Sequence, residues 1–158
     1  MLTAMFTEAI VESFEDAIAV LPALVMFIPM LMDTAGNAGA QSSALIIRGM
    51  ALGEIRPKDV IRVLWRELSV ALICGVSLSA VNFLRVFIMG GDALLSLTIS
   101  LTLILTIIIA KILGCMLPML AKKIKIDPAV MAAPLITTIA DVSALLLYFS
   151  LANIILGI

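Results

Sequence analysis

Residues 134–149 read PLITTIADVSALLLYF, an apolar stretch with one acidic residue, Asp141. No Lys, Arg or His follows Lys125, so no cation on the same segment neutralises this carboxylate. A carboxylate inside a membrane segment must be protonated, paired with a cation on another helix, or exposed to a watery path for a positive ion. The stretch therefore predicts a membrane helix whose acid has a specific purpose.

The rest of the chain has the composition of an integral membrane protein. Hydrophobic residues make up 63% of its 158 residues, and the mean hydropathy is +1.26. Soluble domains are only about 45 to 50% apolar. Nearly uncharged runs recur at 17–32, 68–84, 93–110 and 128–158. Each approaches the roughly 20 residues that a membrane helix needs, whereas barrel strands need only about 10. We therefore expect one all-α transmembrane domain over residues 1–158.

Five transmembrane helices are expected. The first, from Met1 to about Val11, is short. The second lies in residues 17–52, which is too long for one straight crossing. Its prolines and glycines predict a kinked helix, because proline removes a backbone donor and glycine weakens the helix. These residues are Pro22, Pro29, Gly36 and Gly39.

The last three helices are expected to follow short connections. Pro57 should open the third helix, with residues 58–66 as an amphipathic lead-in. Residues 83–92 are predicted to form a turn, and the fourth helix should cover 93–120. The fifth helix should begin at Pro128.

The basic residues predict the orientation. Eight of the ten Lys and Arg residues fall in the two loops that follow the second and fourth helices. They are Arg48, Arg56, Lys58, Arg62, Arg66, Lys122, Lys123 and Lys125. Because cytoplasmic loops are rich in Lys and Arg, we expect a multi-pass protein of the cell inner (plasma) membrane. Its N-terminus would be cytoplasmic and its C-terminus outside.

Oxygen atoms are predicted to gather beside Asp141. Thr138, Thr137 and Pro134 lie three, four and seven residues before it, so all four share one helical stripe. Pro134 should leave a carbonyl group of the preceding turn unpaired. In a helix that begins at Pro128, Asp141 would lie about 20 Å from the cytoplasmic end.

A second polar segment, residues 33–43, is expected to interrupt the second helix. Asp33, Asn37 and Gln41 fall four residues apart on one face, among small residues that allow close backbone approach. We interpret this face as the wall of a pore. Helix packing is the alternative for the glycines alone, and a bond from Asp141 to Lys111 or Arg85 is the structural alternative for the acid.

These candidate groups favour a hard divalent cation. They are oxygen donors, and the chain has no histidine, whereas zinc and copper prefer nitrogen and sulfur. One acid per subunit suits a hydrated Mg²⁺ ion better than a calcium cage. Mn²⁺ and other divalent cations are also compatible. A symmetric dimer would bring two carboxylates to one ion.

Two long segments resemble one family. They are PMLMDTAGNAGAQSSALIIRGMALGEI (Pro29–Ile55) and DPAVMAAPLITTIADVSALLLYF (Asp127–Phe149). With the order of helices between them, the chain resembles the transmembrane domain of the MgtE family of magnesium channels and transporters. The family's cytosolic N-domain and paired CBS domains have no counterpart in this sequence.

The resemblance implies a homodimer whose ion path is lined by the second and fifth helices. Asp141 matches the pore acid that holds a hydrated Mg²⁺ ion, and Thr137 matches a position that offers a backbone carbonyl. Gly36, Asn37 and Gly39 match the glycine-rich stretch of the second helix. Ala35 replaces the first residue of the family's glycine pair, and Asp33 precedes it.

The predicted function is therefore passage of Mg²⁺ through a dimeric pore in the lipid bilayer. A sodium-coupled exchanger, with Asp33 in a second cation site, and a non-conducting membrane scaffold are the alternatives. An enzyme such as a lipid transferase is disfavoured, because the acids are scattered along the depth of the membrane. No nucleic-acid partner is expected, and residues 58–66 are a candidate contact for a cytosolic sensor domain.

Overall fold

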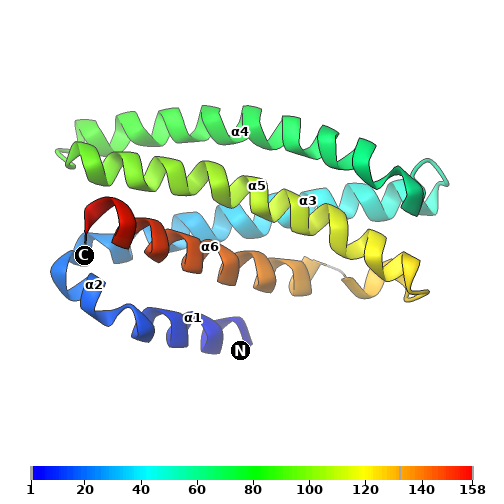
Figure 1. Ribbon diagram of the computed structural model, residues 1–158, viewed down its shortest axis with the longest axis horizontal. Helices are drawn as coiled ribbons and strands as arrows, with labels where there is room; N and C mark the ends of the chain where they lie inside the picture. The colour runs from blue at the N-terminus through cyan, green and yellow to red at the C-terminus, as the bar shows by residue number, and fades with distance from the viewer. Residues whose placement is uncertain (1, 132, 158) are drawn as a thin grey trace.

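The computed structural model describes residues 2–131 and 133–157 of the chain. These residues form helices joined by short turns, with no strand among them, which confirms the predicted all-α class (Figure 1). In chain order the elements are α1 (Leu2–Ser13), α2 (Glu15–Val20), the 3₁₀ turn η1 (Pro22–Phe27), α3 (Ile28–Ala51), the 3₁₀ turn η2 (Pro57–Asp59), α4 (Val60–Ile88), α5 (Ala93–Lys123), the 3₁₀ turn η3 (Pro128–Met131) and α6 (Ala133–Leu156).

Four helical stretches in the described part of the chain are long and apolar enough to cross a membrane. They are Pro22–Ala51, Pro57–Ile88, Ala93–Lys123 and Pro134–Leu156. The first helix, α1, is short as predicted: its 12 residues span about 18 Å, against about 30 Å of hydrocarbon. It packs against α6 (Figure 1). The chain is therefore a membrane-embedded helical bundle.

The irregular backbone of the second span lies before its polar segment. The 3₁₀ turn η1 begins at Pro22, and Pro29 lies in the first turn of α3, where a missing backbone donor costs nothing. From Ile28 to Ala51 the α-helix is continuous. The expectation that residues 33–43 interrupt the helix is therefore wrong, because their small side chains are packed inside the bundle.

The central layer of the bundle is formed by α3, α5 and α6, which all contact one another. Helix α4 packs against α5 on the outside of this layer (Figure 1). Its outer face exposes large apolar side chains, among them Ile73 and Val81, as expected of a lipid-facing helix. Because α4 continues to Ile88, the predicted turn at 83–92 shrinks to residues 89–92. The Asp92 carboxylate caps α5 by accepting the Leu94 amide hydrogen at 3.2 Å.

The fifth span does not run unbroken from Pro128. A 3₁₀ turn covers Pro128–Met131, and α6 begins at Ala133. Pro134 therefore lies in the first turn of α6 and does not break a continuing helix, because that turn needs no donor from it. Asp141 comes eight residues after Ala133 (141 − 133), which is about 12 Å along α6. The predicted depth of about 20 Å assumed one helix from Pro128, and the 3₁₀ turn contradicts that assumption.

The C-terminal half of α6 is fixed by the N-terminal segments. Tyr148 and Phe149 are fully buried. The Tyr148 hydroxyl donates to the Leu24 carbonyl oxygen at 3.0 Å, and the ring of Phe149 stacks on Phe14 with centroids 4.9 Å apart. These contacts hold the α6 helix, and with it Asp141, against the rest of the bundle.

Candidate cation site

The carboxyl group of Asp141 faces the backbone of α3 at Gly36, which has no side chain. A Cβ atom added to Gly36 would lie 3.3 Å from Asp141 Oδ1 and 3.4 Å from Thr137 Cγ2. The Oδ1 atom is buried and has no hydrogen-bond partner within the described residues. An unpartnered carboxylate oxygen in a membrane protein is costly, which is why such groups mark ion paths or relays. The structure thus brings together Gly36, Thr137 and Asp141.

The two threonines of the predicted stripe share one acceptor. The hydroxyl groups of Thr137 and Thr138 donate to the Pro134 carbonyl oxygen at 3.0 and 2.9 Å. Each hydroxyl oxygen still has lone pairs with which to accept a hydrogen bond. Oxygen atoms therefore follow the stripe from the start of α6 to Asp141, and the Pro134 carbonyl oxygen is the acceptor that the two hydroxyl groups share.

The amide and acid face of α3 borders a cavity on the side of α4 and α5. Asp33, Asn37 and Gln41 line a cavity of about 250 Å³ together with residues of α4 and α5. Both Asp33 and Asn37 are exposed. Asp33 lies about one helical turn before Gly36 on α3. Neither Asp33 nor Asp141 forms an ion pair in the part of the chain that the structure describes.

Gly39 occupies a different environment from Gly36. A Cβ atom on Gly39 would lie 3.0 Å from Ile136 Cγ2 and 3.3 Å from the Ala110 carbonyl oxygen. A Cβ atom on Gly114 would collide with the Gly39 carbonyl oxygen. These contacts belong to a close crossing of α3, α5 and α6, so the structure does not bring Gly39 to Asp141. Its position agrees with the helix-packing alternative.

Lys111 is paired with an acid that the sequence interpretation missed. Its Nζ atom lies 3.1 Å from Oε2 of Glu67, and the Ser42 hydroxyl donates to the same oxygen at 2.6 Å. All three residues are buried. Lys111 is therefore not the partner of Asp141. Glu67 directly precedes the uncharged run 68–84, and an acid next to one membrane segment with a lysine inside another was a signal for this pair.

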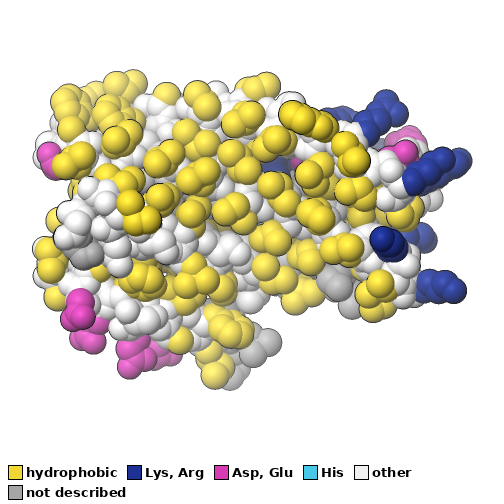
Figure 2. Space-filling model, in the orientation of Figure 1, with side chains coloured by type: hydrophobic (Ala, Val, Ile, Leu, Met, Phe, Trp, Pro, Cys, Tyr) yellow, Lys and Arg dark blue, Asp and Glu magenta, His cyan; other side chains and the backbone are white. Residues whose placement is uncertain are grey.

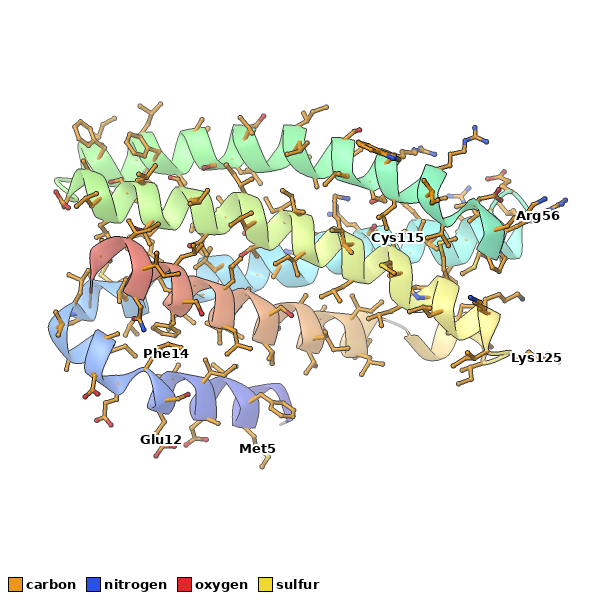
Figure 3. All side chains as sticks on the ribbon, viewed as in Figure 1. Met5, Glu12, Phe14, Arg56, Cys115 and Lys125 are labelled. Atoms are coloured by element: carbon orange, nitrogen blue, oxygen red, sulfur yellow. The ribbon has the colours of Figure 1, made fainter. Side chains whose placement is uncertain are left out.

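Basic side chains are concentrated at one end of the bundle. Lys and Arg side chains gather at the end where α3 meets α4 and α5 meets α6, whereas Asp and Glu side chains are seen at both ends (Figure 2). Arg56 and Lys125 point outward at the basic end, far from Glu12 (Figure 3). The two basic loops therefore lie on one side, as the charge pattern predicted.

The described residues include no cluster of three or more His, Cys, Asp or Glu side chains that could hold a metal ion. A single acid with backbone and hydroxyl oxygens nearby fits an ion that keeps its water, as Mg²⁺ does. A polytopic helical bundle with such a site is typical of the membrane proteins that bind or move cations.

The chain belongs to the MgtE family. The family model, described as a divalent cation transporter, matches residues 28–151. The chain is 36% identical over 156 residues to the magnesium transporter MgtE of Thermus thermophilus, which covers 99% of this chain and 34% of the relative. It is 35% identical over 149 residues to the magnesium transporter MgtE of Bacillus subtilis, covering 94% of this chain and 33% of the relative. The chain thus spans about a third of the length of these curated relatives.

Proposed function

We propose that two copies of the chain form a pore that passes hydrated divalent cations, above all Mg²⁺, across the membrane. The observation that carries this proposal is the unpartnered Asp141 Oδ1 atom beside the bare backbone of Gly36. The names of the relatives, which are magnesium transporters, supply the ion. Mn²⁺ and similar hard cations would be held by the same oxygen donors.

The need for a second copy follows from charge. One carboxylate balances half of the charge on a divalent ion, and a two-fold axis beside α3 and α6 would place two Asp141 side chains around the same ion. Asp33, Asn37 and Asp141 are at least partly exposed in a single chain. They are therefore available to line a path between two copies.

In this pore each residue has a separate role. Asp141 would accept hydrogen bonds from water molecules on the ion, and its charge would hold the ion on the axis. Thr137, Thr138 and the backbone near Gly36 would offer further oxygen atoms to these waters, as would the Asn37 amide. Because Mg²⁺ releases water reluctantly, contacts through water cost less than direct ligation. Asp33 would add a second negative charge along the path.

The direct test is flux through the purified chain in liposomes. We expect Mg²⁺ added outside to reach an enclosed indicator, at equal rates with and without a sodium gradient. A flux that requires the sodium gradient would instead support a sodium-coupled exchanger, with Asp33 as the residue to test. No flux above that of empty liposomes would contradict the pore. Chemical cross-linking in the same liposomes should yield dimers.

Gly36→Ala should lower the Mg²⁺ flux about tenfold while the protein stays folded. The added methyl group would lie 3.3 Å from Asp141 Oδ1 and replace water or backbone contacts with an apolar surface. Alanine also favours the helix by about 1 kcal/mol, so unfolding is not the expected cause. Liposome flux at fixed protein density measures the effect.

Gly75→Ala is the matched control for this variant. Gly75 is another buried glycine within a membrane helix, and its added Cβ would make ordinary contacts of 3.4 Å and more with Ile104. Its flux should stay within about twofold of that of the unaltered chain. Equal losses in the two variants would show that helix packing, and not the space beside Asp141, controls the flux.

A further inference from the structure

A groove with two lysines lies at the basic end of the bundle, away from the cation site. It is lined by residues from the η2 turn, the start of α4 and the last turns of α5, and its volume is about 480 Å³. The lining residues are Pro57, Lys58, Val60, Met116, Met119, Leu120 and Lys123. Helix α4 lies on the outside of the bundle, so this groove is on a face that meets lipid.

The groove is apolar at one end and cationic at the other. Met116 precedes Lys123 by seven residues, which places it two helical turns, about 10 Å, deeper along α5. Leu120 is 47% exposed between them, and Lys58 supplies a second ammonium group at the same end as Lys123. An apolar wall of this length below two cations has the shape and polarity of the upper part of an anionic lipid.

Among the described residues, no acidic side chain lines this groove. The nearest acid in sequence, Asp59, accepts the backbone amide hydrogen of Arg56 at 2.9 Å and so caps its own turn. A neighbouring cavity between α3 and α4 differs in this respect, because its three arginines are accompanied by Glu54, Asp59 and Glu67. Of these two cavities, the two-lysine groove is the one whose positive charge has no acidic side chain among its described lining residues. A bound anion would balance that charge.

We propose that this groove binds one anionic phospholipid from the adjoining leaflet. Its phosphate would sit between the ammonium groups of Lys58 and Lys123. One acyl chain would lie along Met116, Met119 and Leu120. Basic pockets at membrane interfaces are known lipid-binding features, and lysine attracts anionic headgroups through charge. The site concerns lipid and is independent of the proposed ion passage.

Native mass spectrometry of the purified chain tests the site. We expect one tightly bound phosphatidylglycerol per copy and little retention of phosphatidylcholine with the same acyl chains. Lys58→Gln with Lys123→Gln should weaken phosphatidylglycerol binding about 25-fold, because each lysine near an anionic group contributes roughly a factor of five. The matched control is Lys122→Gln with Lys125→Gln, which removes the same charge at the same end but outside the groove. It should bind the lipid as the unaltered chain does.

Further variants separate lipid from other occupants. Met116→Trp keeps both lysines and fills the apolar wall, so it should also release the lipid. Inorganic phosphate should not displace the lipid, and displacement would overturn the role of the acyl chain. Equal retention of both lipids, or equal loss in the two lysine pairs, would overturn the site and leave the groove as a surface for a protein segment.

Discussion

Asp141→Asn is expected to reduce Mg²⁺ flux by about 10- to 100-fold while leaving the helical bundle intact. The amide has nearly the same shape as the carboxylate, and Oδ1 gives up no hydrogen bond within the described residues when it is replaced. What is lost is the negative charge, and with it the strong hydrogen bonds to metal-bound water. Hydrogen bonds to charged groups contribute about 1.5 to 3 kcal/mol, which corresponds to the expected range of rates.

The experiment compares this variant with one that loses the same charge elsewhere. Asp16→Asn is a suitable control, because Asp16 is exposed in the first turn of α2, at the end of the bundle opposite the basic loops (Figure 1). Both variants should give the same helical signal and the same elution volume in detergent. Flux that persists in Asp141→Asn at the normal rate would remove Asp141 from the ion path.

Asp33→Asn separates the contribution of Asp33 to the flux from that of Asp141. If both acids lie along one path, as proposed above, this change should weaken flux by a smaller factor than Asp141→Asn. Asp33 is exposed, so solvent already screens much of its charge. Because this variant lacks the screened charge, its rates at low and high ionic strength should differ less than those of Asp141→Asn, which keeps Asp33.

The sequence predicted the membrane class, the short first helix and the common side of the basic loops. These properties follow from the composition and spacing of single segments. The stripe of Pro134, Thr137, Thr138 and Asp141 was also predictable, because residues three and four apart on one helix share a face. The two basic loops could be placed on the same side of the membrane from the number of helices between them alone.

Contacts between helices were not predictable in the same way. From the sequence alone, Lys111 could pair with any of several acids. Its pairing with Glu67 depends on how α4 and α5 cross, and a single sequence does not give that crossing. The continuity of α3 also depends on its neighbours. Small residues such as Gly39 weaken an isolated helix, yet here they allow the close crossing with α5 that stabilises it.

Lys111→Met is expected to destabilise the folded chain by about 3 to 5 kcal/mol, more than any other substitution considered. Removing one partner of a buried ion pair leaves the other charge unpaired, and here the Glu67 carboxylate would keep only the Ser42 hydroxyl. The unpaired Glu67 charge would lie inside the bundle, between α3, α4 and α5.

The double variant Glu67→Gln with Lys111→Met separates charge from packing. It removes both charges, keeps an amide oxygen that can accept from Ser42, and should recover most of the lost stability, because a buried pair often contributes little over neutral groups of similar size. Cys115 is fully buried one turn after Lys111, so its reaction rate with a maleimide reports opening of this region once Cys74, which is exposed, is replaced by serine. Lys111→Met should speed that reaction strongly and the double variant should not. If both variants react equally fast, the bulk of Lys111, and not its charge, holds the three helices together.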